Sequence, residues 1–364
     1  MNNTKKYLIK FTPLDSFFWG GEKTFGIDNE NYFVKSRLFP QQTTILGTLR
    51  FEFLLQNDLM KETKDGLKIN DKLKATKLIG NESFNIENES DNLFGKIMSI
   101  SPVFMMKGNK HYFVKPFDED LNLVFEKGNS LLNKNNNFVA NYTNYKSKIE
   151  YKNTLKSKEN EYFFSERDKK GKEIGAFIEK AQIGIKKNNT GATDDNSFFK
   201  LKGYGLNKGF SFATVIETEN NLETLEPGYV RMGTNRNVFK TEIINDFEFN
   251  TKNIFKSKTD RNRVVLLSDT FVSEEIHEYY DFAKINSISF RNIKTKTDTN
   301  NFYAHPKEKT DISKSNKYNI IERSSVFYVS DENLEKFKTL LNQKYLQNIG
   351  YNCYETIKTA NNEK

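Results

Sequence analysis

The sequence has 364 residues, and 56 Lys and Arg residues outnumber 48 Asp and Glu residues for a formal net charge of +8, which favours a polyanionic partner. The single cysteine, Cys353, excludes an intramolecular disulfide and a cysteine-based zinc site, and the three histidines stand in no ligand spacing, so we expect no metal and no cofactor. No apolar run approaches the roughly 20 residues of a membrane span, and the N-terminal apolar stretch is too short for a signal-peptide core, so we expect a soluble cytoplasmic protein.

The first predicted elements are a strand and a helix. Residues 7–12 alternate with the period of a short strand, which the pair Gly20-Gly21 ends. Pro40 stops any earlier helix, and Thr43 or Thr44 can cap the next one. The apolar stripe of that helix comprises Leu46, Leu49 and Phe53.

The start of this helix is a candidate anion site. Free N–H groups at a helix start attract anions, and Lys35 and Arg37 lie just before it. The arrangement suits a phosphate or a nucleic-acid backbone. A buried aromatic strand end followed by an ordinary capped helix is the alternative, because helix starts favour anions in every protein.

Two polar stretches, residues 61–92 and 133–172, read as insertions. Strand-like aromatic segments lie between them, at 103–106 and 112–114. The second stretch interleaves lysines with tyrosines, a mixture that suits single-stranded nucleic acid but is more typical of a solvated loop.

Five glycines lie between residues 183 and 209, among several lysines. Their spacing matches neither the dinucleotide fingerprint nor a P-loop. Glycine here permits close backbone approach, which serves strand packing or contact with an RNA backbone.

The C-terminal region is the most informative about the fold. Residues 325–329 read as a strand, Ser330 as an N-cap, and residues 349–354 as another strand. Strand, helix, strand is half of a ferredoxin-like unit, and the N-terminal strand and helix can open another. We therefore predict an α+β fold of two ferredoxin-like (RRM-like) units with long polar insertions, an N-terminal unit over 1–215 and a C-terminal unit over 216–364. The helical stripe between the last two strands comprises Leu334, Phe337, Leu340 and Leu341.

Several motifs resemble the family of subunit three of the Cmr complex, RAMP proteins of type III-B CRISPR systems. The likeness runs through nearly the whole chain, although the two polar stretches match nothing specific. The N-terminal motifs are the specific ones: Trp19-Gly20-Gly21-Glu22, Lys35-Ser36, Phe39-Pro40-Gln41-Gln42-Thr43-Thr44, Leu46-Gly47 and Leu49-Arg50. The downstream motifs follow in the family's order: Gly95-Lys96-Ile97, Ser101-Pro102, Ile183-Gly184-Ile185, Arg231-Met232-Gly233, Leu266-Leu267-Ser268-Asp269, Arg323 with Ser325-Val326-Phe327-Tyr328, and Ile349-Gly350-Tyr351.

The sequence departs from the family pattern at two places. Gly233-Thr234 stands where paired glycines are usual, and Arg323-Ser324 where Arg-Gly is usual. Both changes make the loops less permissive for a backbone contact with RNA.

The resemblance implies a non-catalytic RNA-binding subunit of an antiviral effector complex. Such a subunit holds the repeat-derived 5′ handle of the CRISPR RNA and bridges the large palm-domain signalling subunit to the backbone RAMP subunits. The first wall of the implied handle-binding surface comprises Lys35, Ser36, Arg37, Gln41, Gln42, Thr43 and Thr44, and the second comprises Lys186, Lys187 and Asn188. Four arginines serve either the RNA or structural ion pairs: Arg50, Arg231, Arg236 and Arg323.

Two other functions stay open. A CRISPR RNA processing endoribonuclease of the RAMP group would share the fold, but it needs a general base, usually His. His111, His277 and His305 lie in contexts typical of surface histidines. A structural adaptor without RNA contact is the third possibility.

Overall fold

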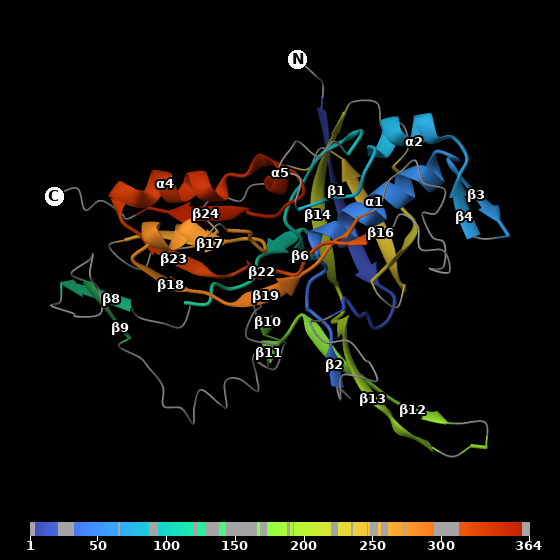
Figure 1. The fold of residues 1–364 in the computed structure, drawn as a ribbon, viewed down its shortest axis with the longest axis horizontal. Helices are drawn as coiled ribbons and strands as arrows, with labels where there is room; N and C mark the ends of the chain where they lie inside the picture. Colours follow the sequence, from blue (N-terminus) through green and yellow to red (C-terminus); the bar gives the residue numbers. More distant parts are fainter. Residues whose placement is uncertain are drawn as a thin grey trace. The chain divides into compact units, whose positions relative to one another are not determined.

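The computed structural model is an α+β protein in which strands predominate over helices (Figure 1). Contacts divide the chain into two compact units, each built from three chain segments. Unit 1 comprises Met1–His111, Ile174–Phe247 and Arg291–Asn316, and unit 2 comprises Tyr112–Glu173, Glu248–Phe290 and Lys317–Lys364. The structure describes residues 4–20, 33–64, 66–86, 94–118, 123–127, 138–142, 166–167, 173–187, 190–191, 193–219, 225–233, 236–245, 247, 254–255, 261–272, 274–294 and 313–358.

A seven-stranded sheet forms the centre of unit 1. Its order is β15-β16-β1-β14-β6-β7, and β5 also pairs with β14. The predicted boundary between residues 215 and 216 falls inside β14, so the units differ from the predicted division of the chain. The strands are β1 (Thr4–Pro13), β5 (Ile97–Ile100), β6 (Phe104–Lys107), β7 (Lys110–Tyr112), β14 (Phe210–Glu219), β15 (Tyr229–Met232) and β16 (Asn237–Asn245).

Helix α1 (Gln42–Gln56) covers one face of this sheet, as its apolar stripe predicted. Leu46, Leu49 and Phe53 are all buried. The predicted threonine cap is wrong, because the N-cap residue is Gln41, whose backbone carbonyl accepts the N–H of Thr44 at 2.9 Å. The start of α1 is therefore stabilised by a backbone hydrogen bond and not by a threonine side chain.

Much of the first predicted insertion lies in regular secondary structure. Strands β3 (Met60–Thr63) and β4 (Gly66–Ile69) form a hairpin, and α2 (Lys72–Ile79) follows. The Asp71 side chain caps α2 by accepting the N–H of Lys74 at 3.0 Å. The polar composition of residues 61–92 thus reflects exposed secondary structure.

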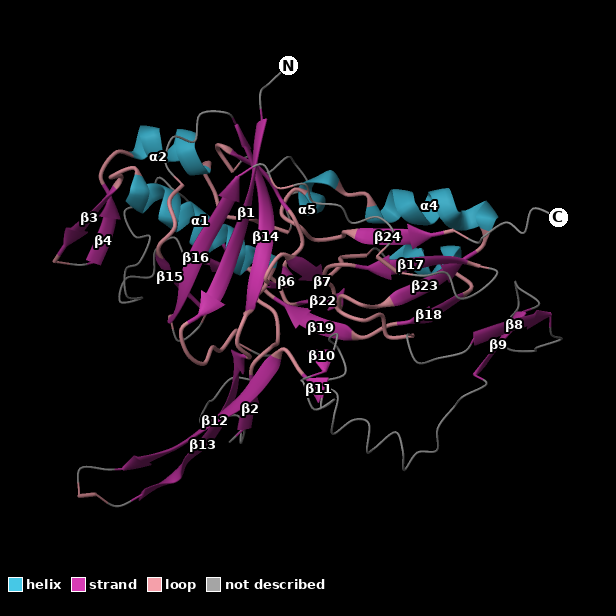
Figure 2. Ribbon diagram, turned by 180° about the vertical axis from the view of Figure 1, so that it is seen from behind, coloured by secondary structure: helices cyan, strands magenta, loops and turns pink. Residues whose placement is uncertain are grey.

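A separate three-stranded sheet in unit 1 carries the glycine-rich segment. Strands β12 (Phe177–Lys187) and β13 (Thr193–Leu206) form a long antiparallel hairpin, and β2 (Phe33–Lys35) pairs with β13 in parallel. Figure 2 shows this hairpin projecting from the sheet strands of the same unit. Most of the second predicted insertion, residues 133–172, lies outside the described residues. The short pairs near it are β8 (Leu123–Lys127) with β9 (Phe138–Tyr142), and β10 (Glu166–Arg167) with β11 (Glu173–Ile174).

Unit 2 contains a four-stranded antiparallel sheet in the order β18-β23-β17-β24. Its core packs Val264 and Phe327 against Phe337 of α4. The elements are β17 (Asn262–Leu266), η1 (Glu274–Tyr279), β18 (Phe282–Lys284), β23 (Val326–Val329), α4 (Asp331–Leu341), α5 (Lys344–Gln347) and β24 (Tyr354–Ile357). Unit 2 also contains the short pair β19 (Ser287–Phe290) with β22 (Tyr318–Ile321), whereas β20 (Ile293–Lys294) and β21 (Ser313–Lys314) pair within unit 1.

The C-terminal predictions are confirmed for β23 and α4 and wrong for residues 349–354. Ser330 is the N-cap residue of α4, although its side chain makes no capping hydrogen bond. Ile349 and Tyr351 are buried in a turn after α5, and the strand begins only at Tyr354. Asn352 explains the difference, because its φ of 52° cannot continue a strand.

Ser324 occupies the position where the family pattern has glycine. Its φ is 75°, in the left-handed region that disfavours side chains by about 1–2 kcal/mol. The side chain is buried, and within the described chain its hydroxyl has no hydrogen-bond partner. The loop at Ser324 therefore has a positive φ that normally favours glycine, and this conformation strains the backbone.

Candidate nucleic-acid interface

The aromatic segment before the glycine turn anchors the candidate interface to the core. Phe17 and Trp19 are buried, and Trp19 stacks on Phe239 with ring centroids 5.1 Å apart. Phe17 exchanges two backbone hydrogen bonds with Tyr204 of β13, at 2.6 and 3.0 Å. Gly203 permits this approach, because a Cβ atom there would lie 2.7 Å from the Phe17 carbonyl oxygen. This glycine is therefore a packing requirement of the site.

Ser36 fastens β2 to the aromatic segment. Its buried Oγ accepts the N–H of Trp19 at 2.8 Å and donates to the Arg37 carbonyl at 2.7 Å. The Ser36 N–H donates to the Lys202 carbonyl at 2.8 Å, and the N–H of half-buried Arg37 donates to the Gly20 carbonyl at 3.0 Å. The buried Ser36 side chain therefore positions the backbone of this segment.

Lys35 lies on an exposed surface shared by β2 and β13. Phe33 is in register with Lys200, and Lys35 with Lys202. Residues in register point to the same face of a sheet. The Lys200 Nζ lies 5.9 Å from the centroid of the Phe33 ring, which is 45% exposed, and the Lys202 Nζ pairs with Glu179 at 2.5 Å. We call the set Phe33, Lys35 and Lys200 the β2–β13 surface.

Phe33 and Lys200 are not among the site residues that the sequence motifs indicate. A signal was present, because Phe198, Lys200 and Lys202 recur at every second position and therefore share one face of a strand. Only the parallel pairing with β2 adds Phe33 and Lys35 to that face.

Gln42 is buried inside unit 1. Its Nε2 donates to the Ser101 carbonyl at 3.0 Å, and its Oε1 accepts the N–H of Val103 at 3.1 Å. Gln42 thus holds α1 against the loop before β6, and its role as an RNA ligand stays a prediction. The other predicted residues at this helix end are half-buried: Gln41, Thr43 and Thr44.

Arg50 is also a structural residue. It is 3% exposed, and its Nε donates to the carbonyl of Ile79 at the end of α2, at 2.9 Å. Burial lowers the pKa of its guanidinium to about 10, so the side chain stays charged at neutral pH. A cation at a helix C-terminus satisfies an orphan carbonyl and opposes the helix dipole. Arg50 therefore joins α1 to the end of α2, and its RNA contact stays a prediction.

The three remaining arginines divide into one buried and two exposed. Arg323 is buried, with its Nε 3.5 Å from a carboxylate oxygen of Asp269 that also accepts its backbone N–H. Arg231 and Arg236 are exposed on either side of Gly233. A Cβ atom at Gly233 would lie 2.6 Å from a backbone oxygen of the aromatic segment, so this glycine serves packing.

The predicted second wall lies toward the tip of the β12–β13 hairpin. Ile183 is in register with Lys200, so Lys186 lies three residues, about 10 Å, further along the strand. The side chains of Lys186 and Lys187, and the whole of Asn188, lie outside the described residues.

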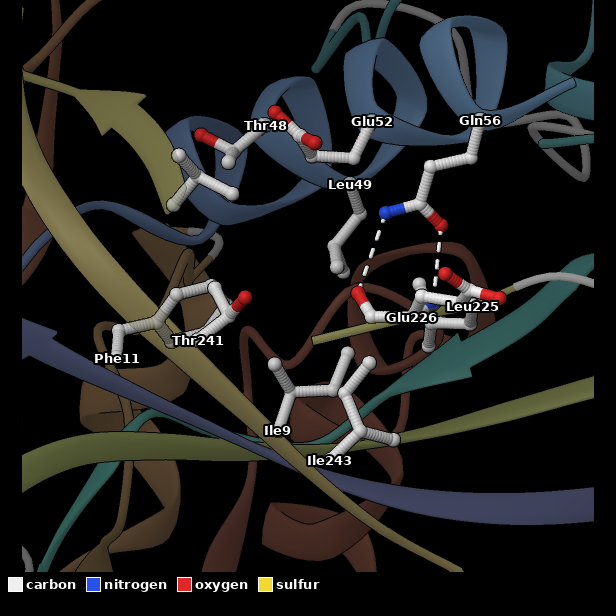
Figure 3. Close-up of a pocket in the computed structure, with 11 residues that line it drawn as sticks. Ile9, Phe11, Thr48, Leu49, Glu52, Gln56, Leu225, Glu226, Thr241 and Ile243 are labelled. Atoms are coloured by element: carbon white, nitrogen blue, oxygen red, sulfur yellow. Dashed lines mark hydrogen bonds between the residues drawn. The ribbon is translucent and has the colours of Figure 1, made fainter. Parts of the chain in front are cut away.

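A shallow pocket lies between α1 and the sheet of unit 1 (Figure 3). Gln56 closes one end by exchanging two hydrogen bonds with the backbone of Glu226, at 3.2 and 3.1 Å. Glu52 lines the pocket beside apolar side chains such as Ile9 and Ile243. Burial raises the pKa of the Glu52 carboxyl to about 7.

Glu52→Gln should stabilise the protein in a pH-dependent way. Because the pKa of Glu52 is raised in the folded state, its contribution to stability is fully present below about pH 4.5 and is lost as the pH rises through 7. The variant should gain about 1–2 kcal/mol at pH 8 after allowance for solvent screening, and much less at pH 5. Urea unfolding at both pH values measures this, with the exposed Glu226→Gln as the control. Equal gains at the two pH values would contradict the assignment.

No group of His, Cys, Asp and Glu side chains suited to a metal ion occurs within the described residues. Among the described helices, none combines the length and the apolar character needed to span a membrane.

Comparisons with known proteins identify the family. Residues 9–290 match the family described as CRISPR-associated protein (Cas_Cmr3), whereas a search of curated proteins gives no match. Among solved structures, a chain of the type III-B Cmr-beta complex bound to cognate target RNA is 12% identical with a TM-score of 0.47, over 97% of this chain and 99% of that chain. A second structure of that complex, with target RNA and AMPPnP, gives 14% identity and a TM-score of 0.46 over the same shares. A chain of the type III-A Csm3-Csm4 subcomplex gives 11% and 0.34, over 89% of this chain and 94% of that chain. Because the family match spans most of the sequence, the chain belongs to the Cas_Cmr3 family of CRISPR-associated proteins.

Proposed function

We propose that the chain is a non-catalytic subunit of a type III-B Cmr effector complex that holds the 5′ handle of the CRISPR RNA. In this role it bridges the large palm-domain signalling subunit to the backbone RAMP subunits. The family match supports the membership, and the β2–β13 surface supports the RNA contact.

The observation that carries the RNA contact is the composition of this surface. Lys35 and Lys200 present two cations beside the half-exposed ring of Phe33. Single-stranded RNA is held by phosphate contacts to cations and by stacking of bases on aromatic rings. Below the surface, the hydrogen bonds of Ser36 fix the backbone of β2, so the cations are held on a rigid support.

We further infer that both units are ferredoxin-like. In unit 2 the strands β17, β18, β23 and β24 are antiparallel with the spatial order 4-1-3-2, and α4 connects the last two. In unit 1, β1, β6, β14 and β16 have the same order, with α1 after the first strand. This order is the one that a β-α-β-β-α-β unit requires.

Removal of the two cations should weaken RNA binding and its salt dependence together. We expect Lys35→Ala with Lys200→Ala to lower the slope of log affinity against log salt by about 1.4, because each phosphate contact to single-stranded RNA contributes about 0.7. The measurement is the affinity of the purified chain for a CRISPR RNA carrying its 5′ handle, at several salt concentrations.

The control is Lys72→Ala with Lys77→Ala, which removes the same charge from exposed positions of α2. An unchanged slope in the Lys35 and Lys200 variant would place the RNA elsewhere. Denaturing gels of the same mixtures test catalysis. RNA that stays intact supports the non-catalytic role, whereas discrete fragments lost on replacement of a histidine would favour the processing endoribonuclease.

A further inference from the structure

The sheet of unit 1 has a second face that carries exposed side chains on three neighbouring strands. The opposite face packs under α1, with Ile9, Phe11, Val230, Thr241 and Ile243 lining the pocket described above. Successive residues of a strand alternate between faces, so their neighbours point away from α1. In the view of Figure 2 no helix crosses in front of these strands. The aromatic segment follows the C-terminal end of β1. Near that end, the outward residues are Lys10 and Thr12 of β1, Tyr229 and Arg231 of β15, and Val238, Lys240 and Glu242 of β16.

An exposed aromatic ring lies at the edge of this face. Tyr229 is 67% exposed, whereas tyrosine rings are usually buried to a larger extent. It is in register with Lys240, which is in turn in register with Thr12. Two residues further along β15, Arg231 is also exposed. The ring and the two cations are therefore exposed on the same side of β15 and β16, whereas Leu8 and Val215 on that side of β1 and β14 are buried.

The charge on the outward side of β1, β15 and β16 is mainly positive. Of the described outward side chains of these three strands, Glu242 is the one carboxylate, against Lys6, Lys10, Arg231 and Lys240, whereas β14 adds Glu217 and Glu219 beside the other end of β1. The Lys240 Nζ lies 3.4 Å from Glu242, but both side chains are about half-exposed, so this pair is weak and exchangeable. A polyanion would meet a net positive field here.

We propose that this outward face, centred on Tyr229, is a second surface for single-stranded RNA. A base stacks on the Tyr229 ring, and Arg231 and Lys240 contact the adjacent phosphates. The sheet supports the three side chains on paired strands, which fixes their spacing. The surface differs in residues and in sheet from the β2–β13 surface, and its RNA specificity in the cell rests on the proposed function.

The test separates stacking from charge. The probe is a fluorescein-labelled oligouridine of about 12 nucleotides, bound to the full chain and followed by anisotropy over a salt series. Tyr229→Ala should weaken binding about 5- to 150-fold with an unchanged salt slope, while Tyr229→Phe keeps wild-type affinity, because stacking needs the ring and not the hydroxyl. Arg231→Gln with Lys240→Gln should lower the slope by about 1.4. The Lys72→Ala, Lys77→Ala variant again controls for total charge.

The outcomes distinguish this surface from the proposed function. If Tyr229→Ala binds oligouridine as the wild type does, the second surface is overturned, whatever the Lys35 and Lys200 variant shows. Equal losses in Tyr229→Ala and Tyr229→Phe also overturn it, because they indicate a structural effect. If the Tyr229 variants bind RNA normally but lose a protein subunit of the complex, the face is a protein interface. A wild-type chain that binds no RNA contradicts both proposals. If only the Tyr229→Ala variant loses RNA affinity, the result supports this second surface and not the β2–β13 surface.

Discussion

Replacing Arg263 with Ala should lower the free energy of unfolding of unit 2 by about 3–5 kcal/mol, the usual cost of leaving one partner of a buried ion pair uncompensated. Arg263 and Asp118 are 1% and 0% exposed in their side chains. The Arg263 Nε donates to one carboxylate oxygen of Asp118 at 2.8 Å, and its Nη2 donates to the other. The variant would bury the Asp118 carboxylate without its counter-charge.

Tyr328 makes this cluster a group of three. Its hydroxyl donates to the same carboxylate of Asp118, and burial, followed by that negative charge, raises the pKa of the phenol. The three residues join β17, β23 and the described segment that ends at Asp118. Loss of Arg263 therefore disturbs a network and not a single contact.

Urea unfolding followed by circular dichroism, with hydrogen exchange of peptides from β17 and β23, measures the effect. The informative companion is the triple variant Asp118→Leu, Arg263→Met, Tyr328→Phe, which replaces the whole polar cluster by apolar groups and should recover most of the lost stability. Lys338→Ala breaks the exposed pair with Glu335 and should cost less than about 1 kcal/mol. If Arg263→Ala also costs less than about 1 kcal/mol, the uncompensated charge of Asp118 does not determine the stability of unit 2.

Periodicity predicted the elements whose own apolar pattern is regular, even where their packing partners are distant in sequence. The strand around residues 7–12, α1, β23 and α4 each carry an apolar pattern that one neighbouring face can satisfy. The run at 349–354 was misread because short apolar segments are compatible with both a strand and a buried turn. There the positive φ of Asn352 decides the outcome, and no pattern of apolar residues encodes it.

The site was harder to predict because polar side chains near a helix start have two uses. Gln42 and Arg50 had the residue types of anion ligands, yet each satisfies a buried backbone group on another segment. Which use prevails depends on contacts such as the one between Arg50 and Ile79, 29 residues apart. The parallel pairing of β2 with β13 joins residues more than 160 positions apart, so Lys200 could not be placed beside Phe33 from sequence alone.

Gly203→Ala should destabilise unit 1 by about 1–3 kcal/mol, the range typical of overpacking in a filled core. The added Cβ would lie 2.7 Å from the Phe17 carbonyl oxygen, a backbone atom that cannot rotate away. The clash would push Phe17 off Tyr204 and strain the hydrogen bond from the Trp19 N–H to Ser36. Because Ser36 fixes β2, we expect weaker RNA binding by Lys35 as well.

The same strand supplies a matched control two residues away. A Cβ at Gly205 would meet only the flexible end of Lys180, at 4.0 Å, so Gly205→Ala should be neutral or slightly stabilising. Trp19, the single tryptophan of the chain, reports directly on the site, because it stacks on Phe239 in the core. Its fluorescence should shift to longer wavelength and its unfolding midpoint should fall in Gly203→Ala but not in Gly205→Ala. Identical behaviour of the two variants would mean that the aromatic segment does not depend on close backbone contact with β13, and the rigid support inferred for Lys35 would lose its physical basis.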